Sequence, residues 1–209
     1  MMTMSENVVE LDGVSRRFGK TVALDGLSLR VPRGCVYGLV GVNGAGKTTL
    51  IKHILGLLKA RSGSVRVFGL DPVRNPVAVL RRIGYLSEER DLPEWMRIDE
   101  LMRYTAAYHP NWDQAHAEEL LKTFGLDASK KVKNLSKGMR AQAGLVAAVA
   151  HRPDLLVLDE PSTGLDAVIR RDILKAIIRT VADDGRTFQK KEIVDLVDYT
   201  SLVLRRGEL

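Results

Sequence analysis

The sequence predicts an α/β fold with a largely parallel sheet, and three observations support this prediction. Short β-branched runs alternate along the chain with longer segments whose apolar residues recur at helical spacing. A glycine-rich loop separates the predicted strand 36–40 from a strongly amphipathic helix. An apolar run at 155–158 ends in two acidic residues, at the sheet edge where α/β proteins bind ligands.

The predicted elements divide the chain into an α/β core and a helical part. Three short runs are predicted strands in an antiparallel or edge region: 8–11, 27–31 and 64–68. Three apolar runs are predicted buried strands: 36–40, 83–86 and 155–158. Helical patterns follow at 98–108, 114–124, 136–151 and 167–181. We therefore expect one domain, in which a helical subdomain (94–153) is inserted into a core formed by 7–93 and 154–209.

Length and composition favour a single soluble or peripheral domain. The 209 residues are enough for one substantial core, and 45% apolar with 28% charged residues argues against disorder. A net charge of +6 suits a phosphate-bearing ligand or an anionic membrane surface, but no single basic segment indicates nucleic acid. The single cysteine, Cys35, favours a reducing compartment. We expect neither a signal peptide nor a stretch of the roughly 20 apolar residues that span a bilayer.

The loop 41–48 matches the phosphate-loop pattern of two glycines, a lysine and a hydroxyl residue at fixed spacing. Glycines allow the backbone to curl so that its N–H groups point at phosphate oxygens, and the next helix adds its partial positive charge. Lys47 is expected to reach the terminal phosphates of a nucleotide, and the Thr48 hydroxyl to bind Mg²⁺. The alternative is a glycine-rich turn that merely connects a strand to a helix.

Asp159 and Glu160 directly follow the predicted strand 155–158. Asp159 is expected to hold Mg²⁺ through its water shell, and Glu160 to polarise the attacking water as a general base or an orienting group. Taken alone this motif is weak, because many buried strands end in an acidic residue before a proline turn. Its weight comes from its presence in one chain with the phosphate loop.

A third motif, Leu-Ser-Lys-Gly-Met at 135–139, lies between the other two, and Glu-Pro-Ser-Thr-Gly-Leu-Asp follows at 160–166. The order of these motifs resembles the ATP-binding subunit of an ATP-binding-cassette (ABC) transporter. The resemblance covers 8–209 and is nearest to single-domain bacterial subunits of small exporters. It implies a P-loop NTPase fold of the ABC ATPase type, with an antiparallel β part.

The resemblance also implies how such a protein works. The cofactors would be ATP and Mg²⁺, and ATP hydrolysis would drive transport through nucleotide-dependent dimerisation. The partners would be membrane-spanning transporter subunits and a second ATP-binding subunit, with no nucleic acid. The protein would be cytoplasmic and peripheral on the inner face of the cell membrane.

Individual roles follow from matching positions. Phe18 matches the aromatic residue that stacks on adenine, with Val22 nearby, although Phe18 could also be a core residue. Ser136, Gly138 and Asp166 match residues that contact nucleotide or communicate across the dimer, but Ser136 and Asp166 are also good helix N-caps. Catalysis is implied for Lys47 and Glu160, and metal binding for Thr48, Glu88 and Asp159. The implied ATP-binding residues are Phe18, Val22, Gly41, Asn43, Gly44, Ala45, Gly46, Lys47, Thr48, Thr49, Ser136, Gly138 and Asp166.

Two departures from the family pattern affect single residues. The signature reads Leu-Ser-Lys-Gly-Met instead of Leu-Ser-Gly-Gly-Gln, although its serine and second glycine are kept. Glu88 stands where the family usually has a glutamine that touches Mg²⁺; a carboxylate can also bind this ion. The alternative for Glu88 is a solvated side chain in a charge run.

A third departure affects the sheet itself. The family has a strand that ends in a histidine near residue 188, but Phe188 stands there and all four histidines precede Asp159. In the family this strand lies at the centre of the sheet, between the strands here predicted at 36–40 and 155–158. We therefore expect either another segment, for which Thr187-Phe188 is a candidate, to fill the gap, or the domain to be destabilised.

Other functions stay open at this point. A degenerate domain that binds ATP with weak or no hydrolysis is consistent with the missing strand and histidine. A soluble ABC ATPase that acts on nucleic acid is less favoured, since this chain has no tandem cassette, long coiled coil or basic domain. The segment 93–113 is either a docking surface for a partner's helix or part of the helical core, and carries Trp95, Met96, Tyr104, Tyr108 and Trp112.

Overall fold

Two sheets form the framework of the computed structural model, which describes residues 7–33, 35–42, 44–182 and 201–205. The antiparallel sheet has the order β2-β1-β4 and consists of β1 (Asn7–Phe18), β2 (Thr21–Pro32) and β4 (Ser62–Val67). The second sheet has the order β3-β7-β6-β5 and consists of β3 (Val36–Leu39), β5 (Ile83–Leu86), β6 (Leu155–Leu158) and β7 (Ser201–Arg205). The predicted antiparallel part and all six predicted strands are therefore present.

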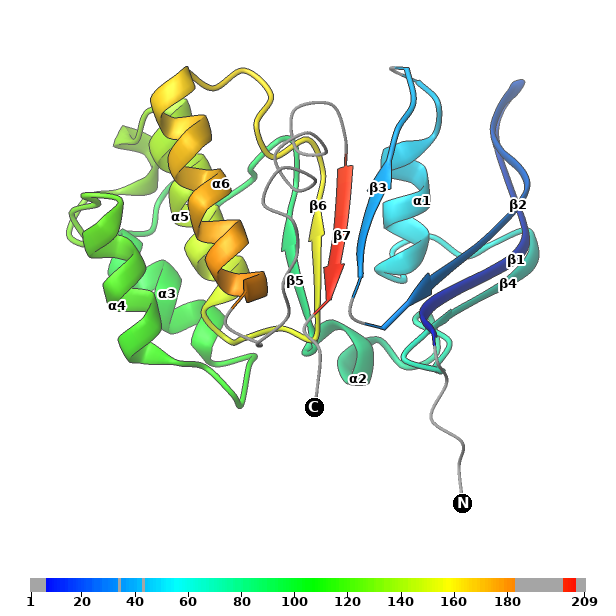
Figure 1. Cartoon of the computed structure of the whole chain (residues 1–209), viewed down its shortest axis with the longest axis horizontal. Coiled ribbons are helices and arrows are strands. Elements are labelled where there is room, and N and C mark those ends of the chain that lie inside the picture. Colours follow the sequence, from blue (N-terminus) through cyan, green and yellow to red (C-terminus); the bar gives the residue numbers. More distant parts are fainter. Residues whose placement is uncertain (1–6, 34, 43, 183–200, 206–209) are drawn as a thin grey trace.

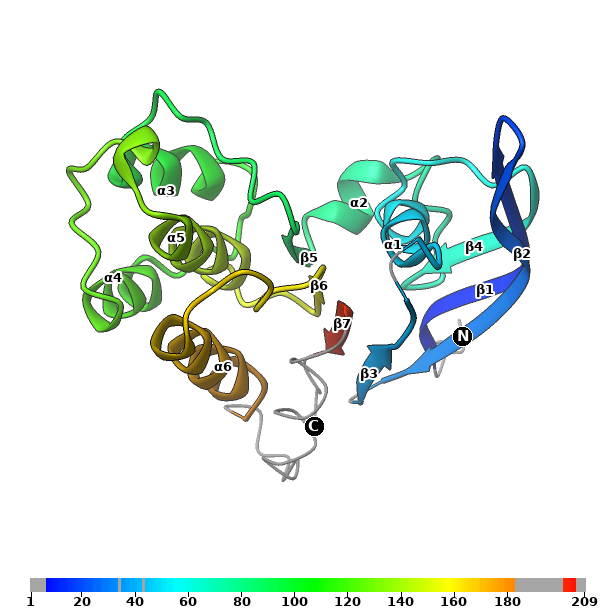
Figure 2. The ribbon, with the colours of Figure 1, turned by 90° about the horizontal axis from the view of Figure 1, so that it is seen from above.

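Helices cover both faces of the four-stranded sheet (Figure 1). Helix α1 (Lys47–Ile54) lies on the side of the antiparallel sheet, and the short helix α2 (Pro76–Leu80) precedes β5. The opposite side carries α3 (Ile98–Ala106), α4 (Gln114–Thr123), α5 (Lys137–Val149) and α6 (Ala167–Ala182), with a 3-10 turn (Val132–Asn134) before α5. A view from above separates these helices from the antiparallel sheet (Figure 2). Within the described ranges, no helix combines the length and apolarity needed to cross a bilayer.

Strand β6 joins two hydrophobic cores, because successive side chains of a strand point to opposite faces. Leu156 and Leu158 pack with the helical core formed mainly by α3 to α6. Leu155 and Val157 pack with the core formed by α1 and the antiparallel sheet. All four side chains are at most 3% exposed. The apolar run before Asp159 is thus a buried strand, as the sequence predicted.

Helix α5 lies directly on β5 because glycines remove the side chains between them. A Cβ on Gly84 would lie 2.1 Å from the carbonyl oxygen of Ala148, and one on Gly144 would lie 2.9 Å from a methyl group of Leu86. Any larger residue at Gly84 would push the helix away from the strand. This contact fixes the helical part against the strand that leads to Glu88.

Strand β7 occupies the centre of the sheet and runs antiparallel to both of its neighbours. Val203 is the register partner of Tyr37 in β3 and of Val157 in β6. The expectation that another segment fills the central position is therefore confirmed, and the segment is Ser201–Arg205; Thr187-Phe188 lies outside the described residues. Because β5 and β6 pair in parallel, the sheet is mixed. β7, which comes later in the sequence and runs antiparallel to β3 and β6, provides hydrogen-bond partners for the backbone groups of both strands.

The central position of β7 predicts the effect of a proline there. Val203→Pro removes a backbone N–H from the ladder and leaves a buried carbonyl unpaired, which costs about 1–3 kcal/mol of unfolding free energy. Urea denaturation measures this loss. Val203→Thr is the matched control, because it keeps both the N–H and the β-branched shape. Equal unfolding midpoints for the wild type and Val203→Pro would contradict a central β7.

Candidate active site

The loop between β3 and α1 curls around the start of the helix. Gly44 and Gly46 have φ angles of 83° and 90°, and the Ala45 N–H donates to the Val42 carbonyl over 3.0 Å. A Cβ on Gly46 would lie 2.3 Å from the carbonyl oxygen of Ala23. Only glycine therefore allows β2 to approach this turn so closely. The loop has the strand–loop–helix setting that the phosphate-loop pattern requires.

Lys47, the first residue of α1, joins this loop to the acidic end of β6. Its Nζ donates to the carbonyl of Gly41 over 2.6 Å and to that of Val42 over 3.4 Å. The same Nζ lies 3.7 Å from Oε1 of Glu160, and the two side chains are only 11% and 22% exposed. The two motifs, more than a hundred positions apart in the sequence, thus meet at one point.

Asp159 and Glu160 have different surroundings at the end of β6. Asp159 is 1% exposed, and its N–H donates to the Leu86 carbonyl over 2.9 Å, which continues the β5–β6 pairing. Glu160 has a φ of 48°, a conformation that non-glycine residues adopt rarely and often at functional sites. The Thr163 hydroxyl donates to Oε2 of Glu160 over 3.0 Å. The turn after β6 therefore holds the Glu160 carboxylate beside Lys47.

A cavity of about 380 Å³ brings residues from three strand ends together. It is lined by Thr21, Ala23, Gly44, Gly46, Lys47, Thr48, Thr49, Glu88 and Glu160. Glu88 follows β5 and, although exposed, faces this cavity together with Lys47. Thr21 and Ala23 were not predicted as site residues. Their only signal in the sequence is Gly46, whose lack of a side chain leaves room for β2 beside the loop.

The oxygen groups at this cavity fit Mg²⁺. Thr48, Glu88 and Glu160 line it, and hydroxyl and carboxylate oxygens are the ligands that Mg²⁺ prefers. In the described part of the chain, no three His, Cys, Asp or Glu residues form a cluster able to hold a metal ion. The arrangement therefore suits an ion that takes one or two protein oxygens and completes its shell with water and phosphate.

Phe18 and Val22 lie on the hairpin that joins β1 to β2. They are 47% and 44% exposed, so Phe18 is not a core residue. Phe18 pairs with Thr21, which lines the cavity, and the Arg16 guanidinium lies 4.9 Å from the Phe18 ring centroid. An accessible aromatic ring thus stands next to the cavity wall. Asn43 lies outside the described residues.

Ser136, Gly138 and Asp166 are not among the residues that line this cavity. The Ser136 hydroxyl accepts the Met139 N–H over 3.2 Å and caps α5. One carboxylate oxygen of Asp166 accepts two N–H groups in the first turn of α6, each over 3.0 Å. The interpretation of both residues as N-caps is confirmed. A Cβ on Gly138 would lie 3.1 Å from Ile169, so α5 and α6 pack closely here.

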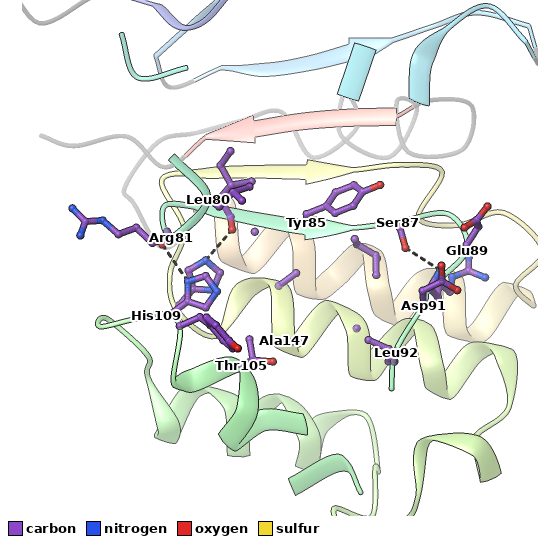
Figure 3. Close-up of a pocket in the computed structure, with 18 of the residues that line it drawn as sticks. Leu80, Arg81, Tyr85, Ser87, Glu89, Asp91, Leu92, Thr105, His109 and Ala147 are labelled. Atoms are coloured by element: carbon purple, nitrogen blue, oxygen red, sulfur yellow. Dashed lines mark hydrogen bonds between the residues drawn. The ribbon is translucent and has the colours of Figure 1, made fainter. Parts of the chain in front are cut away.

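A larger cavity of about 690 Å³ lies between β5 and the helices α3 and α5 (Figure 3). At one end, the rings of His109 and His151 stack with centroids 3.7 Å apart. His151 is 3% exposed, and its Nε2 donates to the Ile83 carbonyl over 3.2 Å. At the other end lie Ser87 and Asp91, from the loop that follows β5.

The aromatic-rich segment 93–113 divides between core and surface. Met96 is 5% exposed, and Trp112 packs against the helical core. Trp95, Tyr104 and Tyr108 are 70%, 49% and 62% exposed. Of these, Tyr108 lines the larger cavity, and the Tyr104 ring lies against the Tyr108 ring with centroids 5.2 Å apart.

Comparison with known proteins identifies the family of these motifs. Residues 24–163 match the ABC transporter family. The chain belongs to this family. Its glycine-rich loop, its acidic strand end and the intervening Leu-Ser-x-Gly run are therefore motifs of an ABC ATP-binding domain.

Several ABC proteins are similar over most of this chain. Daunorubicin resistance ATP-binding protein DrrA3 of Streptomyces coeruleorubidus is 39% identical over 88% of this chain and 60% of its own length. Uncharacterized ABC transporter ATP-binding protein YhaQ of Bacillus subtilis (strain 168) is 38% identical over 96% of this chain and 69% of its own length. The chain thus spans about 60–69% of these relatives.

Solved structures agree with this assignment. The structure of an ATP-binding subunit of an ABC transporter is 30% identical, covers 84% of this chain and 75% of its own, and superposes with a TM-score of 0.74. A nucleotide-free ATP-binding cassette, 23% identical with a TM-score of 0.67, covers 85% of this chain and 78% of its own and shares the fold.

Stability is expected to depend on pH through His151. Burial, followed by the charge of His109, lowers the pKa of His151 from 6.5 to about 4. Between these values the unfolded chain binds more protons than the folded chain, so stability falls as the pH falls, and the full contribution is present above pH 6.5. Urea denaturation at several pH values measures this trend.

His151→Gln keeps a polar side chain but does not titrate. We expect its unfolding free energy to fall less than that of the wild type between pH 6.5 and pH 4. The carboxylates contribute equally to both proteins, so the difference between the two pH profiles reports on His151. Parallel profiles would refute this prediction.

Proposed function

We propose that this chain is an ATP-binding and ATP-hydrolysing subunit that powers an ABC transporter through nucleotide-driven dimerisation. The observation that carries the proposal is the cavity shared by the phosphate loop, Glu88 and Glu160, in which Lys47 lies 3.7 Å from the Glu160 carboxylate. Family membership supports ATP as the nucleotide. Relatives named for daunorubicin resistance and bacitracin transport support a role in transport.

Each group around the cavity has a chemical task in this proposal. The loop N–H groups and the Lys47 ammonium bind the phosphates, and Glu160 orients and polarises the attacking water. Thr48, Glu88 and, through water, Asp159 would hold Mg²⁺, which neutralises phosphate charge when bound. The accessible Phe18 ring, with Val22 nearby, stacks on adenine.

The remaining predicted residues act across a dimer in this proposal. Ser136, Gly138 and Asp166 do not line the cavity of their own chain. The Ser136 hydroxyl and the N-terminus of α5 form a group suited to a phosphate, and we assign it to the nucleotide of a second copy. In this proposal the chain forms one domain, in which the helical subdomain 94–153 is inserted between 7–93 and 154–209.

The larger cavity supports docking of a membrane-spanning subunit. The exposed Tyr108 lines it and the exposed Tyr104 packs against Tyr108, and exposed aromatic side chains beside a hollow are typical of a surface that accepts a partner's helix. Such docking would hold the protein on the inner face of the cell membrane.

A second candidate is a domain that binds ATP but hydrolyses it slowly. All four histidines precede Asp159, and none is among the residues that line the 380 Å³ cavity. The histidine that the family pattern places near residue 188 would supply one electrostatic contact to the reacting phosphate, and the loss of one such contact lowers the rate of hydrolysis by about 10²–10³. The rate of Glu160-dependent ATP hydrolysis separates the two candidates, since robust turnover supports the first and residual turnover the second.

Replacement of Lys47 tests nucleotide binding. Lys47→Ala removes a charge-assisted phosphate contact and is expected to weaken Mg-ATP binding by at least about tenfold, as measured by calorimetry. Lys52→Ala, on the exposed face of the same helix, is the matched control and is expected to bind as the wild type does. Equal affinities for the wild type and Lys47→Ala would disprove the phosphate-loop assignment.

Replacement of Glu160 tests dimerisation. Glu160→Gln slows hydrolysis, so Mg-ATP is expected to hold two copies together, and light scattering is expected to report a doubled mass. The same variant with ADP or without nucleotide serves as the monomeric control. A protein that stays monomeric with ATP bound, at a concentration on the order of tens of micromolar, would contradict the shared site.

A further inference from the structure

Arg90 is a buried cation in the loop that follows β5, with only 4% of its surface exposed. Its Nη2 donates to the carbonyl of Thr163 over 2.9 Å and to that of Pro161 over 3.4 Å. Its own N–H donates to the Ser87 hydroxyl over 3.0 Å. A guanidinium is planar and stays charged, so it can hold two carbonyls of one turn in a fixed geometry.

The backbone conformation of Arg90 and the burial of its charge both cost folding free energy, which other contacts must offset. Arg90 has a φ of 53°, in the left-handed region that non-glycine residues seldom adopt. Burial also lowers the pKa of its guanidinium, an effect that Glu88 opposes. Strained backbone persists where surrounding contacts over-determine it. For Arg90, these contacts include the two hydrogen bonds to the turn after β6.

That turn is the one that holds Glu160. The Thr163 hydroxyl donates to Oε2 of Glu160 over 3.0 Å, and the Thr163 N–H donates to the Glu160 carbonyl over 3.2 Å. The other carboxylate oxygen of Glu160 lies 3.7 Å from Nζ of Lys47. Arg90, Thr163, Glu160 and Lys47 therefore form an unbroken line of contacts.

We propose that Arg90 is a positioning residue for Glu160: it fixes the turn 160–163 so that the Thr163 hydroxyl orients the Glu160 carboxylate. Arg90 lines the 690 Å³ cavity and is not among the residues that line the 380 Å³ cavity, so it acts through Thr163 and not on the nucleotide. The inference rests on the proposed function, because it assigns Arg90 to hydrolysis.

The loop that carries Arg90 also lies between the two cavities. Glu88 lines the smaller cavity, whereas Ser87, Glu89 and Asp91 line the larger one, where Figure 3 shows them at the end of β5. A partner seated in the larger cavity would therefore touch the same loop that anchors the Glu160 turn. Arg90 supplies the physical link between that surface and the carboxylate.

The test compares steady-state ATP hydrolysis and ATP affinity in single and double variants. Arg90→Gln is expected to lower kcat by at least about tenfold while KM and the calorimetric Kd for ATP change by less than about threefold. Arg90→Lys keeps the charge but offers a single donor nitrogen without the planar geometry, and is expected to recover part of the lost kcat. Thr163→Val is expected to lower kcat in the same way.

The double variant tests whether the two residues act in one line. The kcat of the double variant Arg90→Gln/Thr163→Val is expected to lie within about twofold of the kcat of the slower single variant. The reason is that both substitutions break the same connection between Arg90 and Glu160. A double variant whose fold-loss in kcat equals the product of the two single losses would overturn the proposal. Thr163 is exposed, so Thr163→Val keeps the proposal testable even where Arg90→Gln does not fold.

Arg82→Gln separates positioning from stability. Arg82 likewise ties the residues that flank β5 and β6 together, through an ion pair with Asp154 over 2.5 Å at the opposite end of the β5–β6 pair. This variant is expected to lower Tm and leave kcat unchanged. If Arg90→Gln and Thr163→Val likewise lower Tm alone, Arg90 is a structural residue and the proposal is wrong.

The wild type and Glu160→Gln are measured first. A wild type without Glu160-dependent hydrolysis would overturn the proposed function, and this inference would fall with it. A wild type that hydrolyses ATP, together with an Arg90→Gln variant that keeps full kcat, would overturn this inference alone.

Discussion

The pairing of β7 with both β3 and β6 is the contact on which the candidate site depends. β3 leads into the phosphate loop and β6 leads into Asp159 and Glu160, and one hydrogen-bonded strand separates them. Two strand spacings amount to about 10 Å, a separation that the long Lys47 side chain and the Glu160 carboxylate together bridge. Without a strand in this place, the backbone groups of both neighbours would be unpaired in the interior.

The helical part is tied to the same sheet through β5. Its parallel pairing with β6 brings a third strand end to the site, and Gly84 lets α5 lie directly on it. The loop after β5 then carries Glu88 to the smaller cavity and Arg90 to the turn that holds Glu160. A displacement of the helices against the sheet would therefore reach the Glu160 carboxylate through Arg90 and Thr163.

Features that depend on local sequence could be predicted, whereas those that depend on partners across the fold could not. The four apolar residues before Asp159 predicted a buried strand with the correct bounds, and Gly44, Gly46 and Lys47 predicted the curled loop. The apolar run 202–204 carries no information about direction or partner, so its antiparallel insertion at the sheet centre was not predictable. Arg90 stands in a charge run typical of solvent-exposed segments, and its burial arises only from the turn it meets.

Amide hydrogen exchange with and without Mg-ATP tests whether β7 holds the two motifs together as one nucleotide site. We expect slow exchange across Ser201–Arg205 in both states, comparable to that of β6, because these amides pair inside the sheet. Mg-ATP should then slow exchange in the phosphate loop and in the turn 160–163 together. Fast exchange across Ser201–Arg205, or ATP protection confined to one of the two motifs, would contradict this role of β7.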